Sequence, residues 1–329
     1  MKYVGPFVLA AAAALGIALG APLATAVLGL MAFGVLHNVP ELRYVAGRFE
    51  NVLSGRLLWV LAGLITAIVI CRLAATVVGQ PARIAEILVG YAVLGAACVF
   101  ALRGWRLAVS ALTLAVAVGA SLAFPGYHFV ILAHLHNVAP LFFLWEWAGR
   151  LRNPRLFRWV QVGWVLGIPA LMLAGAFDWA LGDVTASTVA AFAGDPARIV
   201  AVSALPGGGT MMGARFLVVF AFLQTMHYFV WVYFLPRHAP DAAAAFEQRV
   251  PWLSNRRAWL LGGGLGAALA VLFVIDYASG RAVYGAFAAY HAYLEFPVLI
   301  ALLMSGAAGS QLVFRETAPR SQEPAAVSR

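Results

Sequence analysis

Long apolar runs, separated by short clusters of proline, glycine and charged residues, recur along nearly the whole chain. A run of about 18 apolar residues or more is long enough to cross the hydrocarbon core of a bilayer as a helix. An alternative interpretation makes residues 1–26 a cleaved signal peptide, because Ala24, Thr25 and Ala26 resemble a cleavage site. The pattern predicts ten helices, over residues 4–20, 23–46, 57–79, 82–102, 105–124, 127–148, 156–177, 214–236, 258–279 and 283–305.

The composition supports a membrane protein. Of the 329 residues, 63% are hydrophobic and 11% are charged, and the mean hydropathy is +0.89. Soluble globular domains average about 45–50% apolar and about 25% charged residues. The predicted fold is therefore an all-α polytopic bundle that forms one transmembrane domain over residues 1–314. The polar residues 315–329, which include two prolines, are predicted to be a disordered cytoplasmic tail.

The basic residues indicate how the bundle is oriented. In the layout with ten helices, 17 of the 22 Lys and Arg residues lie on one side of the membrane. Cytoplasmic loops are enriched in Lys and Arg, so both termini are predicted to be cytoplasmic, in a membrane such as the bacterial inner membrane. The net charge of +9 comes from short clusters between apolar segments, and this pattern does not favour a nucleic-acid partner.

Five of the seven histidines fall inside the predicted helices. A rise of about 1.5 Å per residue places them roughly 12–21 Å below the external boundary, within a core about 30 Å thick. Their four helices run in the same direction, so the five side chains can share one layer. His128 and His238 lie near the membrane boundaries and are interpreted as ordinary interfacial residues. The five histidines at membrane depth are His37, His134, His136, His227 and His291.

Two carboxylates accompany these histidines. Glu41 follows His37 by four residues, and Glu295 follows His291 by four. This spacing places both side chains of a pair on one helix face. Because an ionisable group at this depth costs about 3 kcal/mol, such groups usually mark function. Imidazole and carboxylate are typical ligands of iron or manganese, so the sequence predicts a metal centre. Glu41 and Glu295 are the predicted catalytic residues, either as ligands or as hydrogen-bond partners of the histidines.

A short repeat links the second and sixth helices. His37 is followed by Asn38, Val and Pro, and His136 is followed by Asn137, Val, Ala and Pro140. The prolines predict kinks, and each Asn is a candidate partner that orients the neighbouring imidazole. In the alternative interpretation, the prolines only bend the helices and the Asn side chains join them.

His134 and His136 are about 200° apart around a helix, so both cannot point at one centre from regular geometry. We therefore predict His136 as the ligand. His134 is a further candidate ligand if the distortion at Pro140 turns it inward, and otherwise it supports a ligand or packs between helices.

Two more polar residues are candidates for binding a cofactor. Gln224 lies on the same helix face as His227. Arg72 is a charge inside the third helix. It either pairs with a carboxylate such as Glu295 or Asp276, or binds an anionic group of a substrate or a haem propionate.

Three function classes fit these residues. The first is a non-haem metal enzyme, most simply an iron oxygenase or desaturase, that uses dioxygen, a lipophilic substrate from the bilayer and an electron donor. The second is a haem or copper redox protein in which pairs of histidines are axial ligands. The third is a proton- or ion-coupled transporter. The chain lacks the HxxxH and HxxHH boxes of membrane fatty-acid desaturases, which weakens the desaturase interpretation.

The scattered histidines on separate helices resemble the Brp/Blh-type carotenoid dioxygenases, polytopic membrane proteins that hold one iron in this way. The resemblance is architectural, because that family's His-Gly and His-Phe signatures are not found in this sequence. It implies iron bound by His37, His136, His227 and His291, and oxidative cleavage of a carotenoid to an aldehyde. Other isoprenoids and acyl lipids are alternative substrates.

Overall fold

The structure of the chain is a computed structural model that describes residues 2–182, 189–207 and 209–306. These described residues are folded into helices and connecting turns, without strands, which confirms the all-α prediction. The predicted tail at 315–329 lies outside them. The α-helices are α1 (Val4–Gly20), α2 (Pro22–Arg48), α3 (Gly55–Val78), α4 (Gln80–Ala101), α5 (Gly104–Ala123), α6 (Pro125–Val138), α7 (Pro140–Trp147), α8 (Pro154–Val162), α9 (Ile168–Leu173), α10 (Ala190–Ala193), α11 (Pro196–Ser203), α12 (Thr210–Tyr228), α13 (Leu235–His238), α14 (Pro240–Arg249), α15 (Asn255–Ile275) and α16 (Tyr277–Gly306).

Nine helical segments of the described chain are long and apolar enough to cross a membrane. They correspond to the second to tenth predicted helices, and the first predicted helix is the shorter apolar helix α1. Phe7 of α1 is fully buried, and Ala14 and Ala18 on the same helix are also buried. This helix therefore packs as part of the bundle, as the interpretation with ten helices requires. The sidedness of the membrane stays a prediction.

Prolines interrupt several of the long helices. α6 ends at Val138 and α7 begins at Pro140, so the sixth predicted segment is a kinked pair. Two π-helical segments, Gly163–Gly167 and Phe229–Phe234, come directly before the turns that contain Pro169 and Pro236. A proline removes one helical hydrogen bond and clashes with the carbonyl four residues earlier, and a wider turn at that point relieves the clash.

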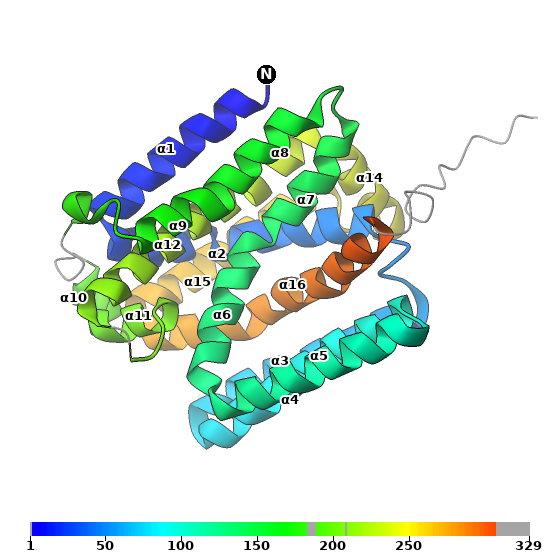
Figure 1. The fold of residues 1–329 in the computed structure, drawn as a ribbon, viewed down its shortest axis with the longest axis horizontal. Helices are drawn as coiled ribbons and strands as arrows, with labels where there is room; N and C mark the ends of the chain where they lie inside the picture. Colours follow the sequence, from blue (N-terminus) through cyan, green and yellow to red (C-terminus); the bar gives the residue numbers. More distant parts are fainter. Residues whose placement is uncertain (1, 183–188, 208, 307–329) are drawn as a thin grey trace, which may run out of the picture.

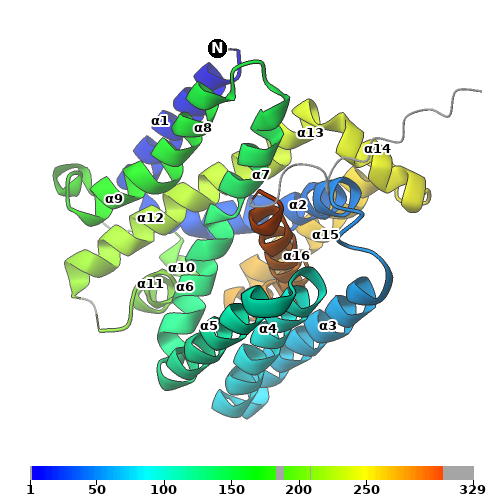
Figure 2. The ribbon, with the colours of Figure 1, turned by 45° about the vertical axis from the view of Figure 1, so that its right-hand side comes forward.

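The bundle has a central group of helices between two outer layers (Figure 1). α2, α12 and α16 lie in the centre, and α15 packs against α2. α3, α4 and α5 form one outer layer, in which α3 and α4 pack against α16 (Figures 1 and 2). α1 and the segment α8–α9 lie on the opposite side, along α12 (Figure 2). α5 has no buried residue, so its surface is suited to face lipid.

The C-terminal end of α2 makes a close backbone approach to α14. A Cβ atom at Gly47 would collide with the carbonyl oxygen of Ala242 and approach the backbone nitrogen of Phe246. Only glycine leaves room for this crossing. Arg43, one turn earlier on α2, also reaches α14 through an ion pair with Glu247.

We expect Gly47→Ala to lower the stability of the bundle by about 1–3 kcal/mol, the usual cost of overpacking a tight contact. The measurement is the thermal unfolding midpoint in detergent. Gly63→Ala is the matched control, since a Cβ at this position in α3 meets no atom within 4 Å. The same midpoint for Gly47→Ala and the original chain would contradict the close contact.

Candidate metal centre

The helices α2, α6, α12 and α16 bring four of the predicted histidines together. The ring centroids of His37 and His291 are 4.9 Å apart, and those of His136 and His227 are 4.5 Å apart. His136 and His291 are separated by 4.8 Å, and His37 and His227 by 5.0 Å. The four imidazoles therefore form one cluster inside the bundle, as their shared depth in the sequence predicts.

Four side chains of this cluster can offer ligand atoms to a single ion. One ligand atom from each of His37, Glu41, His136 and His291 lies within 4.8 Å of all the others. The Nε2 atoms of His136 and His291 are 3.2 Å apart. Two neighbouring imidazole ligands with metal–nitrogen bonds of about 2.1 Å have nitrogen atoms roughly 3.0–3.4 Å apart. The spacing therefore suits two nitrogens that bind the same ion.

Hydrogen bonds fix two of the imidazoles in the orientation that ligands need. His37 Nδ1 donates to the carbonyl oxygen of Phe33 at 2.7 Å, and its Nε2 has no partner. His136 Nδ1 donates to Glu295 Oε2 at 2.8 Å, so its Nε2 is directed to the cluster. A metal-bound histidine usually donates its second N–H to a carbonyl or carboxylate in this manner.

The cluster contains many buried polar atoms without hydrogen-bond partners. His37, Glu41, His227, His291 and Glu295 have exposed fractions of 0–2%. Unpaired atoms include both oxygens of Glu41, both nitrogens of His227 and one oxygen of Glu295. Each such atom costs about 1–3 kcal/mol when it is buried. Glu41 and Glu295 also lie near enough to interact with each other. Two adjacent buried carboxylates require a cation or a shared proton, and a bound metal ion would satisfy these groups together.

His227 occupies a different place from the other three histidines. Its Nε2 lies 3.5 Å from Glu41 Oε2, and it is not part of the group of four ligand atoms. It stands two residues before the π-helical segment Phe229–Phe234, a feature that often marks functional sites. From this position His227 contacts the ligand carboxylate directly.

The structure does not bring His134 into the cluster. Its Nε2 donates to the carbonyl oxygen of Ser203 at 2.8 Å, and its ring packs against Phe216 and Phe220. Both residues lie in the regular part of α6, before Pro140, so the kink does not turn His134 toward His136 and the two side chains stay on different sides of the helix. The prediction of His134 as a metal ligand is therefore wrong, and its role is to join α6 to α11 and α12.

Arg72 pairs with a carboxylate that the sequence analysis did not consider. Its Nε donates to Glu86 Oε1 at 2.7 Å, and its guanidinium also donates to the carbonyl oxygen of Gly285. The prediction of Glu295 or Asp276 as its partner is wrong, because Glu295 accepts from His136 and Asp276 accepts from Ser279. A signal for Glu86 is present in the sequence. Arg72 and Glu86 lie seven residues before and seven residues after Gly79, at equal depth on two adjacent helices.

The predicted amide residues do not contact the ligand nitrogens. Asn38 and Asn137 are the predicted partners of the His37 and His136 rings. In the structure, the carbonyl oxygen of Phe33 holds the first ring and the carboxylate of Glu295 holds the second. Gln224 Nε2 donates to the carbonyl oxygen of Ala26 and to the hydroxyl of Tyr228. The Tyr228 ring lies 4.8 Å from the His37 ring, so Gln224 supports the cluster through one intervening side chain.

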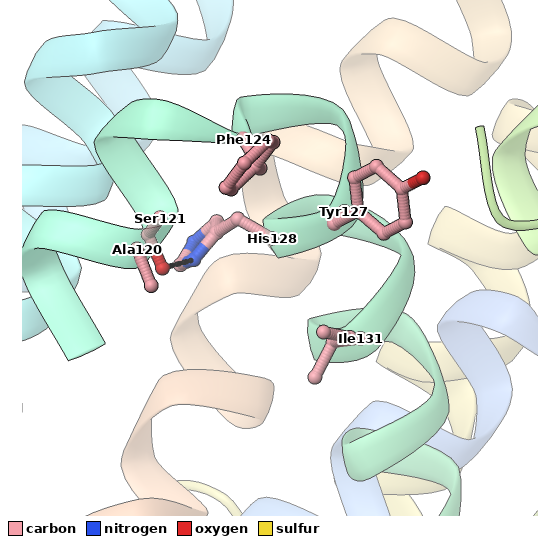
Figure 3. Close-up of a pocket in the computed structure, with 6 residues that line it drawn as sticks. All are labelled: Ala120, Ser121, Phe124, Tyr127, His128 and Ile131. Carbon is pink, nitrogen blue, oxygen red and sulfur yellow. Dashed lines mark hydrogen bonds between the residues drawn. The ribbon is translucent and has the colours of Figure 1, made fainter. Parts of the chain in front are cut away.

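The two remaining histidines lie away from the cluster. His128 lines a cavity of about 460 Å³ where α5 meets α6, and its Nδ1 lies 3.1 Å from Ser121 Oγ (Figure 3). Phe124 and Tyr127 border the same cavity (Figure 3). His238 packs against Tyr3 near the opposite end of the bundle. Their interpretation as residues outside the cluster agrees with this placement.

Comparison of the chain with protein-family models, with curated proteins and with solved structures finds no match. The resemblance to the Brp/Blh-type dioxygenases therefore stays a prediction that rests on the arrangement of histidines.

We expect His37→Ala, His136→Ala and His291→Ala each to reduce the bound metal of the purified protein at least tenfold, because each removes a nitrogen ligand. The measurement is elemental analysis of protein purified in mild detergent. His134→Ala is the matched control, since His134 lies two residues from His136 on α6 and points to Ser203. Equal metal content in all four variants would contradict the assigned ligands.

Glu41→Gln and Glu295→Gln should differ in their effect on metal affinity. Glu41 offers a ligand oxygen, so its loss should release the metal, whereas Glu295→Gln should weaken binding about 10–100-fold through the orientation of His136. Competition with a chelator measures both affinities. Glu247→Gln, in the ion pair with Arg43 on α14, should retain the original affinity. An unchanged affinity in Glu295→Gln would show that its bond to His136 has no role in binding.

Proposed function

We propose that this protein is a membrane-embedded non-haem metal enzyme, an iron oxygenase or desaturase that acts on a lipophilic substrate. The observation that carries the proposal is the convergence of three imidazole nitrogens and one carboxylate on a single buried point. Mixed histidine and carboxylate ligands with open positions are typical of non-haem iron sites. Bound iron would supply the redox chemistry through which dioxygen attacks a C–H or C=C bond.

The side chains around the site support this chemistry in distinct ways. The His136 side chain is 17% exposed, while those of the other cluster residues are almost completely buried, so a substrate approaches from the side of α6. Glu295 fixes the His136 ring through Oε2 and retains Oε1, which has no partner and can hold a proton. His227 lies beside Glu41, so its Nε2 can orient the ligand carboxylate. The apolar surroundings limit the access of water to the reacting atoms.

The geometry favours iron over the alternatives predicted from the sequence. A haem needs a flat slot between its axial histidines, whereas four pairs of these imidazoles have ring centroids only 4.5–5.0 Å apart. Carboxylate ligands favour iron or manganese over copper, for which imidazole and sulfur are the usual donors. Buried carboxylates next to histidines also suit a proton-coupled transporter. The convergence of three imidazoles and a carboxylate within 4.8 Å, with two ring nitrogens 3.2 Å apart, supports a metal site over that alternative.

The location of the site supports a proposal for the substrate class. A cluster inside a membrane bundle can act on acyl or isoprenoid chains that remain in the lipid. Carotenoids are one such class, as the resemblance to the Brp/Blh-type dioxygenases implies. Dioxygen would be the second substrate, and a desaturase or monooxygenase would also require an electron donor.

The test combines elemental analysis with a visible absorption spectrum of protein purified in mild detergent. We expect about one iron per chain without a Soret band, and consumption of dioxygen when acyl or isoprenoid lipids are supplied together with a reductant. The His37→Ala variant should lose both the iron and the dioxygen consumption. A Soret band would contradict the proposal in favour of haem. Proton-driven transport by a protein without tightly held metal would contradict it in favour of a transporter.

A further inference from the structure

A second polar site lies between α2, α11, α12 and α16. It is a cavity of about 60 Å³, and its apolar walls include Leu30, Leu217 and Phe220. Arg281 and Gln224 line it as well. This volume has room for a few water molecules, which is the size of a carboxylate or a phosphate group. A bulky zwitterionic head group does not fit inside it.

Arg281 has no hydrogen bond or ion pair with any residue that the structure describes. Other arginines of the bundle have carboxylate partners, as in Arg72 with Glu86 and Arg215 with Asp178. Arg281 is partly buried, and Tyr277, whose phenol is neutral, lines the same cavity. Its guanidinium nitrogens keep access to solvent and have no partner among the described residues, so this guanidinium is available to bind an anion.

Gln224 supplies an independent observation at the same cavity. Its exposed fraction is 4%, and its Oε1 has no hydrogen-bond partner. The orientation of the amide is fixed, because Nε2 donates to Ala26 and to Tyr228. The unpaired Oε1 needs a donor, which the hydroxyl of a protonated phosphate or the water beside a carboxylate would provide.

We propose that this cavity binds the oxyanion head group, carboxylate or phosphate, of a single-chain amphiphile, with Arg281 as its cationic partner. The apolar walls favour an amphiphile over a free anion, because its hydrocarbon chain can remain against apolar side chains. Arg281 precedes His291 by ten residues on α16, a separation of about 15 Å along the helix. The role of this cavity as a substrate site rests on the proposed function. When the substrate of the proposed enzyme has its head group in this cavity, the chain carbon about 15 Å from the head group lies at the depth of the metal.

The experiment is photocrosslinking in nanodiscs with a palmitate that carries a diazirine near its carboxylate. Crosslinks are located by mass spectrometry, and we expect them on α11 and α12 beside the cavity. Arg281→Gln should reduce them at least tenfold, and Arg281→Lys should retain most of them because the charge remains. Arg83→Gln is the matched control, since Arg83 lies in the first turn of α4 on the same predicted side and is exposed.

Competitors identify the chemistry of the ligand. Oleate or oleyl phosphate should displace the probe at a concentration at least tenfold lower than oleyl alcohol, and acetate or inorganic phosphate should not displace it. The relative strengths of oleate and oleyl phosphate distinguish a carboxylate from a phosphate head group. Displacement by acetate or inorganic phosphate as strong as by oleate would overturn the amphiphile in favour of a free anion. Equal competition by oleyl alcohol, or unchanged crosslinking in a folded Arg281→Gln protein, would overturn the site itself.

A metal-free variant separates this inference from the proposed function. Crosslinking of His37→Ala at the original level shows that the cavity binds its ligand without the metal. If the protein binds the amphiphile but contains no metal in any form, the proposed enzyme fails and the binding site remains. If it holds iron but crosslinks elsewhere, only the cavity assignment fails.

Discussion

The burial of ionisable groups in a lipid-spanning bundle is the constraint on which this structure depends. Some of these groups are neutralised in ion pairs, as Glu86 is by Arg72 and Arg43 is by Glu247. In such pairs the electrostatic attraction offsets the loss of hydration. The histidine cluster differs because its carboxylates lie beside one another and many of its atoms have no partner. The distribution of unpaired atoms thus separates polar groups that hold helices together from those available to a ligand.

Much of the bundle follows from the sequence because lipid imposes a simple rule on it. Each crossing requires a long apolar helix, so the length of an apolar run predicts a membrane-spanning helix. The direction in which that helix crosses then predicts the depth of each of its residues. His37, His136 and His291 were placed at one level by this argument alone. The four-residue spacing that joins Glu41 to His37 and Glu295 to His291 put both carboxylates on the face of the ligands. Depth and helix face were sufficient to indicate the cluster.

The remaining details depend on the rotation and packing of helices, which hydropathy does not specify. The packing of α6 against its neighbours sets which face of α6 meets α16. His136 lies on that face, and His134 lies on another face, where it contacts Ser203. The pairing of Arg72 with Glu86 depends on the antiparallel contact of α3 and α4 rather than on either segment alone. Glu41 and Glu295 have the same spacing from a histidine, yet one offers a ligand atom and the other binds the back of His136. Only the relation between helices distinguishes these two roles.

Prolines explain how four helices meet at one level without running parallel. Each cluster histidine is followed by a proline within ten residues toward the C-terminus: Pro40, Pro140, Pro236 and Pro297. α6 breaks before its proline and α12 widens into a π-helical segment, whereas α2 and α16 continue through theirs. A helix that lacks one hydrogen bond bends at a lower energetic cost. In α6 and α12 the regular α-helix ends within two residues of the cluster histidine, at Val138 and Tyr228.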